Sequence, residues 1–191
     1  MPTVAIVYFS ATGNTKLMAE AIAAGVNAIP NTVANLYRIT GEQISGGRWQ
    51  DDDILEQVSR AEAIVLGTPT YMGGVAAQLK AFIDAAGSIW LSQGWKNKIA
   101  GGFTHSGSPS GDKQGTLLYL ATHAAQHGMI WIGNSTLPDA DSGLNELGAF
   151  LGPMGHGHEE GHISDSEAKT AQQYGQRIAK ATQAWNASQL A

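Results

Sequence analysis

Short apolar, β-branched segments alternate along the chain with longer segments in which apolar residues recur every three or four positions. The short segments are residues 3–9, 33–39, 63–68, 99–105 and 129–133. Apolar runs of this length are typical of parallel strands buried on both faces, and the helical spacing between them is typical of crossover helices. The pattern therefore predicts an α/β fold with a five-stranded parallel sheet.

Each helix expected between these strands carries one apolar stripe. The stripes are Leu17, Met18, Ala21 and Ile22; Leu79, Phe82 and Ile83; and Leu117, Leu120, Ala121 and Ala124. A weaker stripe marks residues 53–60, and capping-box spacing at Ser164 and Glu167 predicts a final helix. The mixed polarity of residues 33–39 indicates an edge strand. We therefore predict a doubly wound, three-layer sandwich with strand order 2-1-3-4-5.

Composition narrows the class of protein. The 191 residues are 43% hydrophobic, which suits a single domain over residues 1–191. The absence of cysteine excludes thiolate metal sites and cysteine nucleophiles. A net charge of -5 argues against nucleic-acid binding, which needs clustered Lys and Arg. No leader or membrane-length apolar run is seen, so we expect a cytoplasmic protein without membrane insertion that acts on small molecules.

Three loops are expected at the carboxyl ends of neighbouring strands, where ligands of open parallel sheets bind. The first loop contains Ser10, Thr12, Gly13, Asn14 and Thr15 and opens the first helix. Its hydroxyls and the backbone N–H groups at a helix N-terminus suit a phosphate dianion. The loop has no Lys or Arg, so we expect neutral donors to hold the phosphate, and a Walker motif is absent. Simple capping of the helix is the alternative.

The second loop follows the third strand and contains Pro69, Thr70, Tyr71, Met72 and Gly73. Its glycine permits close backbone approach, while Tyr71 and Met72 offer a flat, polarisable wall to an aromatic heterocycle such as a flavin. Packing of these two side chains on the next helix is the alternative. The loop therefore predicts contact with a flavin ring.

The third loop follows the fourth strand and contains His105, Ser106, Gly107, Ser108, Pro109 and Ser110. Backbone N–H groups of such a loop, aimed at N1 and the C2 carbonyl of a flavin, would stabilise the reduced anionic ring. A flexible surface loop is the alternative. Because the three loops each suit a different part of FMN and leave neighbouring strands, we predict noncovalent FMN binding.

Several motifs resemble those of a known family. Gly67, Thr68, Pro69, Thr70 and Gly73 resemble the flavin loop of the WrbA-type NAD(P)H:quinone oxidoreductases, in the flavodoxin and FMN-reductase superfamily. Residues 103–107 and 128–129 resemble later stretches of that family. The resemblance implies a flavodoxin-like fold, FMN, a nicotinamide donor, a quinone or similar acceptor, and a homodimer or homotetramer.

The sequence departs from the family pattern at three places. The first loop is more similar to that of a flavodoxin, and Tyr71 with Met72 stands where Arg and Phe are common. Gln126 stands where the family often places a His over the flavin. These changes bear on nicotinamide preference and quinone handling rather than on FMN binding.

We therefore predict an FMN-dependent oxidoreductase that passes two electrons from NAD(P)H to a quinone or similar acceptor. Two alternatives remain, a flavodoxin-type one-electron carrier and a non-catalytic FMN-binding partner protein. No catalytic acid or base is assigned, although His105 is a candidate proton donor.

Two features have no assigned role. The histidines fall into two groups, the helical pair His123 and His127 and the loop cluster at residues 156–162, and neither group has a convincing carboxylate partner in its own motif. We predict no metal site at either group. Residues 134–163 exceed ordinary loop length, so we expect this segment to be functional, oligomeric or partly disordered.

Overall fold

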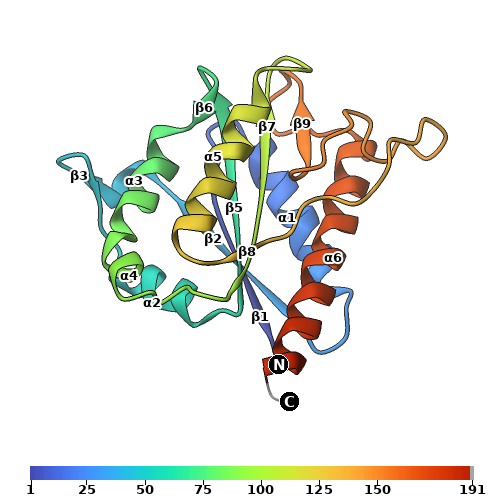
Figure 1. Ribbon diagram of the computed structural model, residues 1–191. Coiled ribbons are helices and arrows are strands. Elements are labelled where there is room, and N and C mark those ends of the chain that lie inside the picture. Colours follow the sequence, from blue (N-terminus) through green and yellow to red (C-terminus); the bar gives the residue numbers. More distant parts are fainter. Residues whose placement is uncertain (190–191) are drawn as a thin grey trace.

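The computed structural model describes residues 1–189, in which helices cover both faces of one sheet (Figure 1). The helices are α1 (Asn14–Asn27), α2 (Asp52–Arg60), α3 (Ala77–Ala85), α4 (Gly87–Leu91), α5 (Lys113–Gln126) and α6 (Asp165–Gln189), with a 3-10 turn, η1, at Gly41–Gln43. The strands are β1 (Thr3–Phe9), β2 (Val33–Ile39), β3 (Ile44–Ser45), β4 (Arg48–Trp49), β5 (Ala63–Tyr71), β6 (Gly74–Val75), β7 (Ile99–Ser106), β8 (Ile130–Trp131) and β9 (Met154–His156).

The central sheet has the order β2-β1-β5-β7-β8, which confirms the predicted order 2-1-3-4-5. All four pairings along this path are parallel, and Tyr8 of β1 lies between Arg38 of β2 and Gly67 of β5. β2 is an edge strand, as its mixed polarity predicted. Because these strands run in one direction, their carboxyl ends all lie at the same edge of the sheet, at the top of Figure 1.

Two apolar cores lie on opposite faces of the sheet. On one face, Met18 and Ile22 of α1 pack with Tyr174 and Ile178 of α6. On the other, residues of α3 and α5 pack around Trp95, which is fully buried. None of the helices within residues 1–189 is long and apolar enough to cross a membrane.

Helices α1 and α6 approach each other closely because each has a glycine at the contact. A Cβ at Gly25 would lie 1.9 Å from the carbonyl oxygen of Gln172, and one at Gly175 would lie 2.1 Å from that of Ile22. The start of α6 has the predicted capping box, since the Glu167 amide donates to Ser164 Oγ and the Ser164 amide donates to Glu167 Oε2. The close contact at Gly25 and Gly175 packs α6 along α1, with the start of α6 beside the carboxyl edge of the sheet.

Two long segments for which the sequence predicts no helix or strand, residues 41–52 and 134–163, are largely irregular. Residues 41–52 form η1 and the β3–β4 hairpin, which buries Trp49 against Phe82. Within residues 134–163, only β9 joins the sheet, where Thr104 of β7 pairs with Met154. β8 pairs with the start of β7 and β9 with its end, so the long segment completes the sheet edge that β8 leaves open.

Candidate functional site

Three chain segments meet at the carboxyl edge of the sheet. They are the first loop (residues 10–15) after β1, the β5–β6 hairpin (residues 69–75), and the edge loop (residues 106–112) after β7. β1, β5 and β7 are adjacent strands, so the structure brings together the three segments that the sequence singled out. Ligands of open α/β sheets bind at such an edge.

The first loop leaves the N-terminus of α1 open to a ligand. Ser10 Oγ accepts hydrogen bonds from the amides of Gly13 (3.1 Å) and Lys16 (3.2 Å), which holds the turn. Gly13 has a φ of 96°, a conformation that glycine adopts without strain. Within residues 1–189, the amides of Asn14 and Thr15 have no protein acceptor, and the first turn of α1 has no acidic residue. Free amides at a helix N-terminus favour an anion.

A second segment covers part of the first loop. We call residues 157–162 the strap. The Asn14 Nδ2 group donates to the carbonyl oxygens of Glu159 and His162, both at 2.7 Å, and the Gly161 amide donates to the Thr12 carbonyl at 2.7 Å. The side chain of Asn14 therefore anchors the strap, which leaves its backbone amide as the group available to a ligand.

A cation lies beside the first loop, although the loop itself contains none. Arg38, near the end of β2, donates from its guanidinium to the Ser10 carbonyl oxygen at 3.0 Å. The neighbouring edge strand thus brings a positive charge to the first loop, where the sequence predicted only neutral donors. Sequence reasoning missed Arg38 because 28 residues separate it from Ser10, and only the parallel pairing of β1 and β2 brings the two together.

The second predicted loop is mostly strand, which corrects the boundary expected at residue 68. β5 continues to Tyr71 because Tyr71 pairs with Gly74 of β6. Met72 and Gly73 form the tight turn, both with positive φ, as in a type I′ hairpin. Pro69 lies beside His105 of β7. Met72 is fully exposed and Tyr71 is about half exposed, so Met72 does not pack on the following helix.

Thr70 points into the protein rather than to the ligand edge. Its hydroxyl lies 2.8 Å from the hydroxyls of both Thr104 and Thr116. This buried chain of hydroxyls joins β5, β7 and α5. The side chain of Thr70 is therefore a structural group, and only its backbone is available to a ligand.

The third predicted segment begins inside β7. His105 and Ser106 are buried strand residues, whereas Gly107 to Ser110 lie at the surface or are partly exposed. The missing side chain of Gly107 makes room for the His158 ring of the strap, since a Cβ there would lie 2.4 Å from that ring. The strap therefore contacts both the first loop and the edge loop.

His105 lies on the face of the sheet that α1 and α6 cover. Its ring neighbours Met18 and Glu167 around Gly155, and its Nε2 is buried without a partner among residues 1–189. Burial lowers the pKa of His105, the Glu167 carboxylate raises it, and Lys113 and His156 lower it further. The ring is held neutral and away from the surface, which argues against His105 as a proton donor to a ligand.

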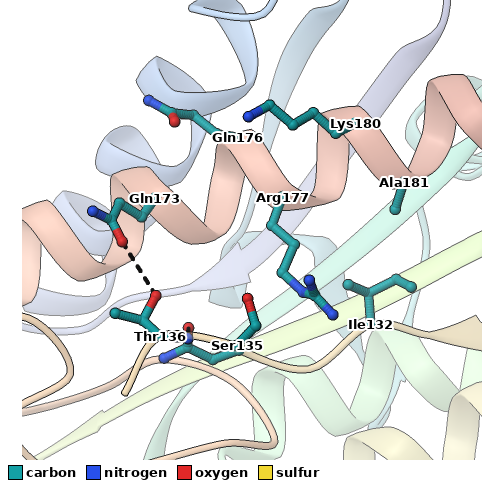
Figure 2. A pocket seen from close by; sticks show the side chains of 9 residues that line it. Ile132, Ser135, Thr136, Gln173, Gln176, Arg177, Lys180 and Ala181 are labelled. Atoms are coloured by element: carbon teal, nitrogen blue, oxygen red, sulfur yellow. Dashed lines mark hydrogen bonds between the residues drawn. The ribbon is translucent and has the colours of Figure 1, made fainter. Parts of the chain in front are cut away.

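Two cavities lie away from these loops. One, of about 460 Å³, lies between α6 and residues 132–136, where Arg177 points toward the polar chain that follows β8 (Figure 2). The other, of about 570 Å³, lies between α3, α4 and the end of α5 and is lined by His123, Gln126 and His127. Neither contains a residue of the three segments, so cavity size does not locate the candidate site. The free amides of Asn14 and Thr15, at the carboxyl edge of the sheet, locate the candidate site instead.

Comparison with known proteins assigns the family. The profile described as NADPH-dependent FMN reductase matches residues 4–141. The chain belongs to this family. It is 36% identical to Flavodoxin FldP of Pseudomonas aeruginosa, over 94% of this chain and 96% of that protein. It is 32% identical to an NAD(P)H dehydrogenase (quinone) of Solidesulfovibrio magneticus, over 81% of each chain.

A solved structure agrees with this assignment. The WrbA-like flavodoxin of Agrobacterium tumefaciens superposes with a TM-score of 0.76 at 36% identity, over 96% of this chain and 99% of that one. These findings confirm the WrbA-type resemblance and the flavodoxin-like fold that the sequence predicted.

Proposed function

We propose that this chain is an FMN-dependent oxidoreductase that passes two electrons from NAD(P)H to a quinone or similar small acceptor. Membership of the NADPH-dependent FMN reductase family supports this class, as do the relatives named NAD(P)H dehydrogenase (quinone). The structural observation that carries the proposal is the open N-terminus of α1, where the amides of Asn14 and Thr15 lack protein acceptors within residues 1–189.

The residues at this edge fit the chemistry of FMN. A phosphate monoester is a dianion, and two free amides, nearby hydroxyls and the Arg38 guanidinium supply donors and positive charge. An acidic residue in the first turn of α1 would repel the phosphate, and the helix has none there. The β5–β6 hairpin adds the exposed side chains of Tyr71 and Met72, which suit an aromatic ring.

We assign roles to the predicted residues accordingly. Ser10 and residues 12–15 hold the phosphate, with Ser10 shaping the turn and Asn14 acting through its amide. Pro69 to Gly73 border the ring, and Thr70 acts through its backbone because its hydroxyl is engaged inside the protein. Ser106 to Ser110 border the pyrimidine edge of the ring.

Bound FMN would supply the two-electron chemistry that links a nicotinamide donor to the acceptor. The chain supplies position and electrostatics. The free amides orient the phosphate, the hairpin borders the ring, and the buried Ser106 and Lys113 hold the edge loop in place. No described side chain is assigned to proton transfer, because His105 is buried on the other side of β7.

The proposal is tested first by FMN binding and then by reduction of the bound FMN. Calorimetry of the apoprotein should show tight binding of FMN and much weaker binding of riboflavin, because riboflavin lacks the phosphate that the α1 N-terminus attracts. Anaerobic stopped-flow mixing of the FMN-loaded protein with NADPH or NADH should then bleach the flavin absorbance, and added benzoquinone should restore it. Absence of FMN binding would falsify the proposal.

A flavodoxin-type electron carrier is the second candidate, because the relative at 36% identity is named Flavodoxin FldP. A carrier would bind FMN equally well but would not be reduced directly by NADPH or NADH, and it would accumulate the one-electron form on partial titration. A non-catalytic FMN-binding partner would retain FMN without reducing benzoquinone. The stopped-flow experiment separates all three functions.

A homodimer or homotetramer in the cytoplasm also belongs to this proposal. Light scattering after size-exclusion chromatography measures the assembly. Cell fractionation with an antibody against the chain measures the location.

A further inference from the structure

Lys113 is a buried lysine directly beneath the edge loop. It is the first residue of α5 and its side chain is 1% exposed. Its Nζ donates to Ser106 Oγ at 2.9 Å, to the Ser108 carbonyl at 2.7 Å and to the Pro109 carbonyl at 2.8 Å. A lysine ammonium has three N–H donors, so all three are used. The ammonium therefore holds the edge loop at Ser106, Ser108 and Pro109.

The charge of this ammonium is not neutralised by a neighbouring carboxylate. Within residues 1–189, no salt bridge includes Lys113, and all three of its hydrogen-bond acceptors are neutral. Burial lowers the pKa of Lys113, and the more distant Glu167 raises it. A buried cation costs several kcal/mol that an apolar side chain of similar size would not. Buried charges of this kind concentrate at functional sites.

The geometry of the loop shows how the ammonium orients its backbone. The carbonyl groups of Ser108 and Pro109 both point inward to Lys113. No peptide bond of the described chain is cis, so the Ser110 N–H points away from the Pro109 carbonyl and hence away from the ammonium. Ser110 is exposed, and its amide has no acceptor within residues 1–189. Lys113 thus turns backbone carbonyls inward and an amide donor outward.

The edge loop adjoins the β5–β6 hairpin. Pro69 pairs with His105 at the ends of β5 and β7, and a Cβ at Gly73 would lie 3.9 Å from the Asp112 Cβ. A Cβ at Gly115 of α5 would lie 3.0 Å from the Gly73 carbonyl. The outward amide therefore lies in the loop next to the hairpin that borders the proposed ring.

We propose that Lys113 is a positioning residue that presets the edge loop to donate the Ser110 backbone N–H to the pyrimidine edge of bound FMN, and that its buried charge favours the two-electron-reduced ring. This inference rests on the proposed function. Hydride transfer from the reduced nicotinamide carries two electrons and one proton to the ring and leaves the nicotinamide oxidised. The cation and the outward N–H donor of the edge loop would stabilise the negative charge that this reduction would place on the pyrimidine edge of the ring.

The test compares affinities for oxidised and reduced FMN. Lys113→Met removes the charge and the three donors, and Lys113→Gln removes the charge but keeps an N–H₂ donor. The matched control is Lys98→Met, because Lys98 is a partly buried lysine that donates to the Ala61 carbonyl at the opposite edge of the sheet. Dissociation constants are measured by flavin fluorescence for oxidised FMN and, after dithionite reduction, by anaerobic calorimetry for reduced FMN.

The proposal predicts that the ratio of reduced to oxidised affinity falls by about tenfold in Lys113→Met and Lys113→Gln, which is about 30 mV for a two-electron couple. Lys98→Met should keep the wild-type ratio within twofold. A ratio unchanged in a folded Lys113→Met protein, or in Lys113→Gln if the Met variant does not fold, overturns the role of Lys113. If the wild type binds no FMN, the proposed function fails instead, so the two failures are distinguishable.

Discussion

Two clusters of buried ionisable groups lie at opposite ends of the sheet and behave differently. The carboxyl-end cluster is Lys113 with Ser106 and the carbonyl groups of Ser108 and Pro109. The amino-end cluster consists of His123, His127 and Trp95, in which the rings of Trp95 and His127 lie 4.6 Å apart. Burial lowers the pKa of Lys113, His123 and His127.

The clusters differ in whether their polar atoms have partners. All three N–H donors of Lys113 have acceptors in the edge loop. His123 Nε2 and His127 Nδ1, by contrast, have no hydrogen-bond partner within residues 1–189. Burial lowers the pKa of both histidines, and burial together with the neighbouring His127 lowers the pKa of His123 to about 4. We therefore predict that substitutions at the carboxyl end change ligand binding and that substitutions at the amino end change the response of stability to pH.

The largest expected effect is at the first loop. Gly13→Val should weaken FMN binding by about 100-fold, or about 2.7 kcal/mol, because valine is strained at a φ of 96° and its Cβ would lie 3.0 Å from the Gly161 Cα of the strap. Calorimetry with FMN measures the loss. Riboflavin, which has no phosphate, should lose much less affinity.

Gly87→Val is the matched control for that substitution. Gly87 lines the cavity at the amino end, has open space around a Cβ and has no positive φ. Its FMN affinity should stay within twofold of wild type. Equal losses of FMN affinity in the two variants would contradict the division between the two ends of the sheet.

An intermediate effect is expected from acid at the amino end. An unfolded histidine binds a proton below about pH 6.5, whereas folded His123 stays neutral until about pH 4, so the unfolded state gains stability as the pH falls between these values. His123 should therefore lower the free energy of unfolding by about 2 kcal/mol between pH 7.5 and pH 5. His127 and Lys80 add to this shift and Asp84 opposes it.

Urea unfolding at the two pH values checks this effect. His123→Leu should remove about 2 kcal/mol of the difference between pH 7.5 and pH 5. His162→Gln, which alters an exposed histidine of the strap, should leave the difference unchanged. The assignment to His123 is wrong if the Leu variant keeps the full acid sensitivity of the wild type.

The smallest effect is expected at Gln126. This residue is exposed at the end of α5 and lines the amino-end cavity, so within one chain it lies at the opposite end of the sheet from the three segments. Gln126→Ala should change FMN affinity by less than twofold in fluorescence titrations. A larger loss would mean that Gln126 of a second copy of this chain reaches the candidate site. The two ends of the sheet would then be separate within one chain but adjacent between two copies.

Much of the fold could be predicted from local patterns. The strand order, the edge position of β2 and the capping box of α6 were all correct, because hydrophobic period and cap spacing are properties of neighbouring residues. The ends of β5 and β7 were less predictable. The predicted strands ended at Thr68 and His105, yet pairing with neighbouring strands extends the sheet through the turn-forming or polar residues Pro69 to Tyr71 and through Ser106.

The sequence by itself determined the five strands of the central sheet, most of the helices that cover it and the three segments that reach its carboxyl edge, because these follow from periodicity and from the common direction of parallel strands. Only the tertiary structure decided what organises those segments. Arg38 reaches Ser10 across paired strands, the strap reaches Asn14 from almost 150 residues away, and Lys113 is buried under its own loop. The contacts of Arg38 and of the strap depend on packing between distant parts of the chain, and the burial of Lys113 depends on the path of its own loop, so no hydrophobic period predicts them.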